Sequence, residues 1–452
     1  MAAGNPKSLK ERVLRAGGWS LAGYGLGQMI RFGSNLIMTR LLVPDMFGVM
    51  AVAQVFLIGL TLFSDLGLVK NIIQSHRGDE PLFLNTVWAV QILRGILLCV
   101  MALLFALILH LAGGEHWLPL ATAYADPRLP PVIAALSLNA LIAGFESTKS
   151  GLARRHLSFA AITKMELTSQ LVAFGAMLLW AVFERSIWAL VIGSIVSISV
   201  RVILSHAILP GPGNRWQWEP RAFTEIFRFG KWIFVTSVIG FFANSGDRLM
   251  LGGLVDSTTL GLYAIAFLIM GAAQNAMMRL LAQVCFPALS EVARESPAKL
   301  RDVYYRFRVP VDLIALSLSG FLFVAGSRIV GLLFDARYSG AGAMLEVLAL
   351  SLLFSRYEVA HQCYFALGKP KLATAVTLLD AAMLYVSIPV AFHYFGLEGA
   401  IFAIALAYAG SLPLDIWWTW RLRLLSIRRE LVTLPAFALG LALGKLLLLI
   451  AK

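Results

Sequence analysis

The chain has 452 residues, of which 59% are hydrophobic and 14% are charged, whereas an average soluble domain has roughly 25% charged residues. This composition excludes a soluble globular protein and predicts an all-α polytopic membrane protein, because no soluble core absorbs so much apolar surface. The net charge of +13 does not indicate a nucleic-acid partner, since the Lys and Arg residues lie between apolar runs and not in a patch on a soluble module.

The first segment, residues 1–16, is basic, and Ser8 followed by Glu11 has the spacing of a helix capping box. We expect a short amphipathic helix here, on the cytoplasmic surface. No small-residue cleavage site follows a short apolar core, so the first apolar run is expected to be a retained span and not a signal peptide.

Apolar runs then follow one another to the end of the chain and predict about 12–13 transmembrane helices. They cover residues 17–40, 46–69, 86–111, 131–148, 165–183, 187–208, 229–252, 260–283, 309–326, 341–367, 373–395, 398–420 and 433–451. The last run contains Lys445 and could be a thirteenth span or a helix lying on the membrane surface.

Lys and Arg predict the orientation, because they accumulate in cytoplasmic loops. With the N-terminus in the cytoplasm, the inner segments hold about four times as many of these residues as the outer loops. The outer loops are all short. Polymerases and ligases of cell-envelope sugars usually need larger outer loops for their chemistry, so the loop lengths favour a transporter.

Two stretches of the sequence repeat one another, residues 17–53 and residues 230–266. The identities include one tryptophan and four glycines: Trp19 with Trp232, Gly17 with Gly230, Gly27 with Gly240, Gly33 with Gly246 and Gly48 with Gly261. Six predicted spans separate the copies, so both halves have the same orientation, as in parallel-repeat transporters whose substrate sits between the lobes. The repeat predicts two pseudo-symmetric six-helix lobes around a central cavity.

The predicted domains follow from this repeat. After the helix at 1–16 come an N-terminal lobe at 17–209, a cytoplasmic linker at 210–228, a C-terminal lobe at 229–420, and a basic turn with an extra hydrophobic helix at 421–452.

Several motifs resemble one known family, the oligosaccharide flippases, which form the Wzx-like branch of the multidrug, oligosaccharidyl-lipid and polysaccharide exporter superfamily. In chain order the motifs are LLVPDMFGVMAVA, GLARRHLSF, SGDRLMLGGLVDSTTLGLYAIA, FPALSEVARES, IVGLLFDARYSGAGAMLEVLALS and FALGKPK. The resemblance implies alternating access in the bacterial inner (plasma) membrane. Its implied substrate is a polyprenyl-diphosphate-linked oligosaccharide, carried to the outer leaflet for exopolysaccharide, capsule or O-antigen synthesis. A glycan polymerase and a chain-length regulator are the implied candidate partners.

Polar side chains inside the spans are the candidate substrate-binding residues, because an ionisable group in a bilayer is costly and usually faces a partner or an aqueous cavity. They are Tyr24, Gln28, Arg31, Asn35, Asn244, Asp247, Arg248, Asn275 and Arg279. Arg31 suits a diphosphate, since guanidinium binds phosphate oxygens in bidentate pairs, but it could instead form an ion pair between lobes. Asp247 and Arg248 could instead anchor a helix end, and Arg279 could reach the cytoplasmic phosphates.

A second group comprises candidates for coupling to a proton or a sodium ion: Asp65, Glu146, Glu358, His361 and Asp380. Arg356 lies close to Glu358 and His361 in one span, so a structural ion-pair cluster is as reasonable as a proton relay. The coupling ion stays open.

Enzymatic motifs are missing from the sequence, which has no G-x-S-x-G, H-E-x-x-H or G-x-x-x-x-G-K-[ST] pattern. Cys99, Cys285 and Cys363 show no paired metal-ligand spacing, so we expect no enzyme activity, disulfide, metal or cofactor. The alternatives to a flippase are a drug or lipid-precursor exporter of the same superfamily and a membrane glycan polymerase or glycosyltransferase. The latter would need a large loop that this chain lacks.

Overall fold

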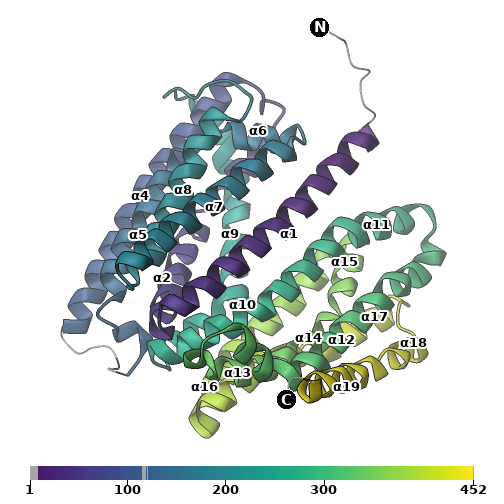
Figure 1. Cartoon of the computed structure of the whole chain (residues 1–452). Helices are drawn as coiled ribbons and strands as arrows, with labels where there is room; N and C mark the ends of the chain where they lie inside the picture. The colour runs from purple at the N-terminus through teal and green to yellow at the C-terminus, as the bar shows by residue number, and fades with distance from the viewer. Residues whose placement is uncertain (1–8, 115–118, 120, 451–452) are drawn as a thin grey trace. The chain divides into compact units, whose positions relative to one another are not determined.

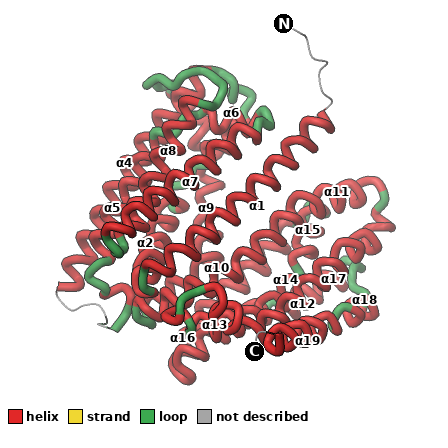
Figure 2. The backbone as a smooth tube through the Cα atoms, viewed as in Figure 1, coloured by secondary structure: helices red, strands yellow, loops and turns green. Residues whose placement is uncertain are grey.

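The computed structural model of the protein describes residues 9–114, 119 and 121–450. In this part of the chain the backbone forms helices joined by loops, with no β-strand (Figure 1) (Figure 2). Two compact units divide the chain between Phe241 and Phe242. We call residues 1–241 lobe one and residues 242–452 lobe two. The predicted all-α fold is confirmed.

The described residues of lobe one form eight α-helices and the first part of a ninth. They are α1 (Leu9–Leu41), α2 (Pro44–Leu62), α3 (Leu68–Gln74), α4 (Pro81–Gly114), α5 (Leu129–Gly144), α6 (Lys149–Arg155), α7 (Phe159–Phe183), α8 (Trp188–Ala207) and α9 (Pro220–Gly252), with a short 3-10 helix at Ala123–Ala125.

Lobe two holds the end of α9 and the remaining helices. They are α10 (Ser257–Leu280), α11 (Phe286–Glu295), α12 (Leu300–Leu333), α13 (Gly340–Leu348), α14 (Leu352–Ser355), α15 (Glu358–Ala366), α16 (Pro370–Leu406), α17 (Leu412–Arg421), α18 (Ile427–Val432) and α19 (Pro435–Ile450). A π-helix at Leu281–Cys285 follows α10, and short 3-10 helices lie at Pro297–Lys299, Ala336–Tyr338, Ala349–Ser351 and Ala407–Ala409.

The N-terminal helix is longer than the sequence predicts. Residues 1–8, including Ser8 of the predicted capping box, lie outside the described residues. From Leu9 onward the helix continues through the first predicted span to Leu41 without interruption. The described part of the predicted amphipathic helix is therefore the beginning of α1.

Proline determines where several long helices begin. Pro44, Pro81, Pro220, Pro370 and Pro435 are the first residues of α2, α4, α9, α16 and α19. Proline is favoured at this position because its φ is already helical and the N–H that it lacks would have no partner inside the helix.

Two glycines in the left-handed conformation interrupt helices, a conformation that other residues rarely adopt. Gly67 (φ 58°) directly precedes α3. Gly396 (φ 63°) kinks α16, at the boundary between the predicted spans 373–395 and 398–420.

In the described residues, nine helices are long and apolar enough to cross a membrane, or ten if the bent pair of α5 and α6 is one span. This number is lower than the predicted 12–13 spans, and the structure gives the physical reasons. The run 341–367 is divided among the short helices α13, α14 and α15, and the segment Pro370–Arg421 counts once although Gly396 kinks it. The first helix, α1, is not among the nine.

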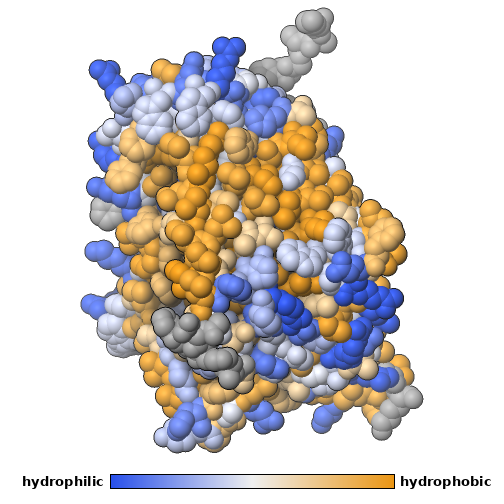
Figure 3. Space-filling model, turned by 90° about the vertical axis from the view of Figure 1, so that its left-hand side faces the viewer, coloured by the Kyte–Doolittle hydropathy of each residue, from blue (hydrophilic) through white to orange (hydrophobic). Residues whose placement is uncertain are grey.

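Small residues let the long helices of lobe one pack closely, as is usual in membranes. A Cβ atom added to Gly95 of α4 would lie 2.7 Å from the carbonyl oxygen of Ala140 in α5. One added to Gly23 of α1 would lie 2.4 Å from the Thr163 side chain of α7. Large apolar side chains cover the outside of the same helices, and Figure 3 shows a broad hydrophobic surface with hydrophilic residues above it.

The C-terminal helix is an integral part of lobe two. α19 packs along α12. A Cβ atom added to Gly440 of α19 would lie 2.1 Å from the carbonyl oxygen of Ser317. A Cβ atom added to Gly320 of α12 would lie 2.3 Å from the carbonyl oxygen of Phe437. The segment Ile427–Ile450 is also long and apolar enough to span a membrane. These features favour a membrane span over a helix lying on the membrane surface.

Candidate functional site

Two interrupted helices of lobe one meet beside a polar cavity. One interruption, residues 63–67, separates α2 from α3, and the other, residues 145–148, separates α5 from α6, which are bent by 63°. α3 and α6 contact each other. Irregular backbone at membrane depth is tolerated where it lines a cavity, and interrupted helices often form binding sites in transporters. The two interruptions therefore indicate a functional region.

Two side chains one turn apart on α4 satisfy backbone carbonyl groups at these interruptions. Arg94 donates from Nη2 to the carbonyl oxygen of Thr61 (2.6 Å) and from Nε to Ser64 Oγ (2.9 Å). Gln91 Nε2 donates to the carbonyl oxygens of the last two residues of α5 (3.1 and 3.2 Å) and to that of Glu146 (2.9 Å). Since unpaired carbonyl groups inside a membrane are costly, α4 stabilises both interruptions.

The cavity of lobe one has a volume of about 590 Å³. Its charged lining residues are Asp65, Lys70, Arg94, Glu146, Arg154 and Arg201. Two ion-coupling candidates, Asp65 and Glu146, thus line one cavity. The sequence places both inside continuous helices, whereas the structure places both at interruptions, because α2 ends at Leu62 and α5 ends at Gly144.

Both carboxylates are already bound to neighbours. Asp65 accepts hydrogen bonds from the backbone N–H of Gly67 (2.8 Å) and from the Ser237 hydroxyl (3.0 Å). Glu146 Oε2 lies 3.6 Å from Arg201 Nε. The charges of this cavity therefore neutralise one another in part and hold α3, α8 and α9 in place.

Lobe two contains a second polar cavity, of about 460 Å³. Four substrate-binding candidates line it, together with one ion-coupling candidate: Asn244, Asp247, Arg248, Asn275 and Glu358. The cavity volume lies within the range of roughly 300–1,000 Å³ that is usual for small-molecule sites.

Asp247 and Arg248 lie within α9, before its end at Gly252, and do not cap it. The buried Asp247 carboxylate accepts a hydrogen bond from the Tyr263 hydroxyl. The guanidinium carbon of Arg248 lies 3.8 Å from the centroid of the Phe267 ring, a cation–π contact. The cavity thus combines aromatic rings with amide, hydroxyl and charged groups.

A histidine lies between two carboxylates beside this cavity. His361 Nδ1 lies 3.3 Å from Glu358 Oε2, and His361 Nε2 lies 3.3 Å from Asp415 Oδ1. The buried Tyr364 hydroxyl donates to Asp415 Oδ1 (3.2 Å). Asp380, on α16, lies further off and interacts with His361 electrostatically. Three of the ion-coupling candidates therefore belong to one cluster, to which the structure adds Asp415.

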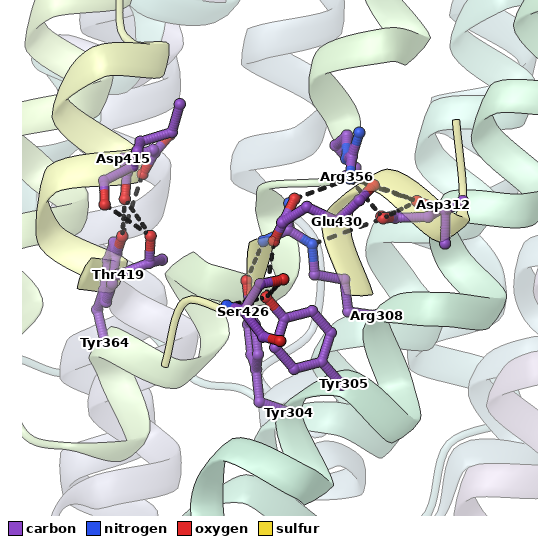
Figure 4. A network of polar contacts seen from close by, with 12 residues as sticks. Tyr304, Tyr305, Arg308, Asp312, Arg356, Tyr364, Asp415, Thr419, Ser426 and Glu430 are labelled. Carbon is purple, nitrogen blue, oxygen red and sulfur yellow. Dashed lines mark hydrogen bonds and ion pairs between the residues drawn. The ribbon is translucent and has the colours of Figure 1, made fainter. Parts of the chain in front are cut away.

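A separate network of charges joins α12 to the C-terminal helices (Figure 4). The fully buried Arg308 contacts Glu430 (Nη2–Oε2, 2.8 Å) and Asp312 (Nε–Oδ2, 3.6 Å). Arg356 Nη2 contacts the same two carboxylates at 2.8 and 2.9 Å. The predicted cluster of Arg356 with Glu358 and His361 is therefore wrong for Arg356.

The polar residues of α1 have varied environments. Arg31 is exposed, whereas Tyr24, Gln28 and Asn35 are half-buried. Asn35 Nδ2 donates to the carbonyl oxygen of Arg31 (2.8 Å). None of the four lines the two cavities described above.

Arg279 is exposed in the last turn of α10 and does not line the lobe-two cavity, although Asn275 one turn earlier does.

Sequence reasoning did not select Arg94, Arg201, Asp415 or Glu430. Arg94 and Arg201 are each a single charged residue inside an apolar run. The same pattern selected Arg31, so it could have selected these two arginines as well. Asp415 and Glu430 meet their partners only through the tertiary fold, and no spacing in the sequence indicates these contacts.

Comparison with known proteins gives both relatives and a similar fold. An uncharacterized membrane protein in the cps region of Klebsiella pneumoniae is 21% identical over 352 residues, 76% of this chain and 69% of that protein. The probable low-salt glycan biosynthesis flippase of Haloferax volcanii is 23% identical over 187 residues, 41% of this chain and 39% of that protein. The chain therefore spans well under half of the latter's length.

Among solved structures, the lipid II flippase MurJ in an inward closed conformation has a TM-score of 0.74. The match covers 96% of this chain and 93% of that one at 11% identity, and it shows a shared two-lobe transporter fold.

A family described as polysaccharide biosynthesis protein matches residues 37–343. Because this match covers more than half of the chain, the protein belongs to the family of polysaccharide biosynthesis proteins.

Proposed function

We propose that this protein is a flippase for polyprenyl-diphosphate-linked oligosaccharide repeat units. It moves them by alternating access from the inner to the outer leaflet of the bacterial inner membrane, for exopolysaccharide, capsule or O-antigen synthesis. The family, a relative named as a glycan biosynthesis flippase and the fold shared with a lipid II flippase all support this function. A glycan polymerase and a chain-length regulator are the proposed partners.

The observation that carries the proposal is the lobe-two cavity. Asn244, Asn275 and Arg248 line it together with aromatic rings. Amide and guanidinium groups can hydrogen-bond sugar hydroxyls, and aromatic rings give sugars an apolar face to pack against. Such a cavity between membrane-spanning helices suits a polar glycan whose lipid tail stays in the bilayer.

Arg31 is the proposed contact for the diphosphate. It is exposed on α1, within the first predicted span, and an uncompensated charge inside a membrane is costly. A diphosphate would offset this cost through paired hydrogen bonds from the guanidinium to its oxygens. In this proposal Tyr24, Gln28, Asn35 and Arg279 are secondary contacts.

His361 is the proposed coupling group, with the proton as the coupling ion. The imidazole of histidine can accept or release a proton, and histidine often serves as a proton shuttle. The charged groups that face it are Glu358 on its own helix, Asp415 on α17 and Asp380 on α16. Gain of a proton by His361 would strengthen its contacts with Glu358 and Asp415, and Glu358 lines the cavity.

The competing functions need different chemistry. A drug exporter for organic cations would gain nothing from the exposed Arg31. An enzyme that polymerises or transfers glycans would need catalytic residues on a large loop, and we propose that this protein is not an enzyme.

The test is transport by the purified full chain in liposomes. A fluorescent polyprenyl-diphosphate oligosaccharide is placed in one leaflet, and its appearance in the other is followed for wild type, Arg31→Ala and Arg40→Ala. Arg40 is the matched control, because it is also exposed on α1.

We expect transport by wild type and by Arg40→Ala, and at least a tenfold loss in Arg31→Ala, since a hydrogen bond to a charged group contributes about 1.5–3 kcal/mol. Equal loss in both variants would contradict the role of Arg31. Absence of transport by folded wild type under every ion gradient would contradict the function.

A further inference from the structure

The segment between α8 and α9 is fastened to lobe one by side-chain hydrogen bonds. Asn214 Oδ1 accepts from Ser147 Oγ (2.6 Å), and Asn214 Nδ2 donates to Thr148 Oγ1 (2.6 Å). The predicted linker is therefore not a free tether at this point, since it is bound to the interruption between α5 and α6.

Further hydrogen bonds hold the same segment against the start of α4. The Arg215 backbone N–H donates to Asn85 Oδ1 (3.0 Å), and Asn85 Nδ2 donates to Gln217 Oε1 (2.7 Å). Glu219 Oε2 accepts from Arg77 Nη2 (2.7 Å). Backbone and side chains of the segment thus have fixed positions, and we call residues 214–228 the strap.

The acidic side chains of the strap point inward. Glu219 accepts a hydrogen bond from Arg77. The hydrogen bonds of Arg77 to Glu219 and to Glu80 raise the pKa of the Arg77 guanidinium above its ordinary value. Glu225 Oε1 accepts a hydrogen bond from Ser75 Oγ (2.6 Å). Both carboxylates of the strap therefore bind side chains elsewhere in lobe one.

The outward side of the strap is aromatic. Trp216, Trp218 and Phe227 have exposed fractions of 59%, 44% and 54%. The rings of Trp218 and Phe223 lie 4.8 Å apart between centroids, and those of Phe223 and Phe227 are stacked at 6.2 Å. Large exposed aromatic side chains on an ordered surface indicate a binding partner.

Three exposed arginines accompany these rings, Arg215, Arg221 and Arg228. Because the two acidic side chains are turned inward, the outward surface is cationic as well as aromatic. Tryptophan is enriched where membrane proteins meet the lipid headgroups, and basic residues there attract anionic lipids. The strap also lies against Arg77, in a segment predicted to be cytoplasmic.

We infer that the strap is a binding site for the headgroups of anionic phospholipids. The arginines contact the lipid phosphate, and the aromatic rings lie among the headgroups. Bound lipid would thereby fix the start of α9, which continues from the strap into lobe two. This inference does not depend on which substrate the protein carries.

The test measures lipid binding by the purified full chain in detergent micelles, with fluorescent phosphatidylglycerol and phosphatidylcholine as probes. The variant is the triple substitution Arg215→Gln, Arg221→Gln and Arg228→Gln. The matched control replaces Arg294, Arg301 and Arg306 of lobe two, which are also exposed. Thermal unfolding of each variant checks its folding.

Each arginine near a membrane surface contributes roughly fivefold to anionic-lipid binding. We therefore expect the preference of wild type for phosphatidylglycerol to fall by up to about 100-fold in the strap variant and to change little in the control. An unchanged preference in the folded strap variant, or an equal loss in the control, would overturn the inference. So would displacement of the lipid by free pyrophosphate at the lipid's own concentration, because the site would then be one for soluble diphosphate.

Discussion

Each lobe pairs an ionisable side chain at an interrupted helix with one on a later helix, but the residue types differ. In lobe one, Glu146 of an interrupted helix faces Arg201 of α8. In lobe two, His361 of an interrupted span faces Asp415 of α17. Arginine stays protonated at any pH that a protein experiences, whereas histidine gains or loses its proton near neutral pH. We therefore propose that the pair in lobe one keeps a constant charge and that the pair in lobe two responds to proton binding.

The lobes also differ in how their cavities are built. In lobe one, Gln91 and Arg94 bind backbone carbonyl groups and so hold two interruptions in shape. In lobe two, the polar groups of Asn244 and Asn275 line the cavity. We therefore expect changes in lobe one to affect stability first, and changes in lobe two to affect substrate and proton responses.

The largest loss of stability is expected from Glu430→Ala. This change tests how far the stability of lobe two depends on ion pairs with arginine, whose charge is constant. This change leaves Arg308 and Arg356 buried with only Asp312 to neutralise them. Breaking a buried ion pair costs about 3–5 kcal/mol, and the free energy of unfolding measured with denaturant should fall by that amount.

Asp302→Ala is the matched control for Glu430→Ala. Asp302 pairs with Arg429 at 2.8 Å, but its side chain is 68% exposed, so its loss should cost at most about 1 kcal/mol. Equal destabilisation by the two changes would show that burial of the network does not set its strength.

Arg94→Ala tests whether α4 stabilises the interruptions of lobe one. Removal of the guanidinium leaves the Thr61 carbonyl and the Ser64 hydroxyl without this donor. A hydrogen bond to a charged group contributes about 1.5–3 kcal/mol, and the free energy of unfolding should fall within that range. Arg185→Ala, a change of an exposed arginine in lobe one, should have no comparable effect, and a similar loss there would refute the role of Arg94.

His361→Gln and Glu146→Gln compare the two pairs directly. The initial rate of transport in liposomes is measured over the widest pH range in which the protein stays folded. His361→Gln removes the proposed proton-binding group and should flatten the pH profile. Glu146→Gln should keep the shape of the profile. A flattened profile in Glu146→Gln alone would assign the proton response to lobe one.

The smallest effect is expected from Asp79→Asn, outside the membrane. Burial raises the pKa of the Asp79 carboxyl, but the hydrogen bond from His156 and the charge of Arg155 outweigh it and lower that pKa below 3.8. A lowered folded-state pKa stabilises the fold above the unfolded value, and this contribution is lost as the pH falls through the folded value.

Because the Asp79 side chain is 51% exposed, the difference in unfolding free energy at pH 7 should be at most about 1 kcal/mol. The difference should disappear as the pH falls below 3.8. A difference that grew on acidification would have the wrong sign.

The sequence predicted local features of the site better than distant ones. Asn244, Arg248 and Asn275 lie on consecutive helices, α9 and α10, so helical spacing and the internal repeat were enough to select residues that line one cavity. The partner of His361 is 54 positions away along the chain, and only the tertiary fold brings the two side chains together.

Arg356 shows why a cluster in the sequence need not be one in space. Arg356 lies in the turn between α14, which ends at Ser355, and α15, which begins at Glu358, so Arg356 and Glu358 do not share a helix face. Arg356 therefore reaches Asp312 and Glu430, whose identity the sequence did not reveal. The interruptions at Asp65 and Glu146 were missed for another reason, since both lie in stretches apolar enough to look like continuous spans.

The most direct test of the account is substrate selectivity in one liposome preparation. The transfer rates of a polyprenyl-diphosphate oligosaccharide and of an organic cation are measured for wild type and for the double variant Asn244→Ala and Asn275→Ala. The account predicts that wild type transfers the lipid-linked oligosaccharide and not the cation, and that the double variant loses this transfer while staying folded. Transfer of the cation by wild type, with none of the lipid-linked oligosaccharide, would contradict it.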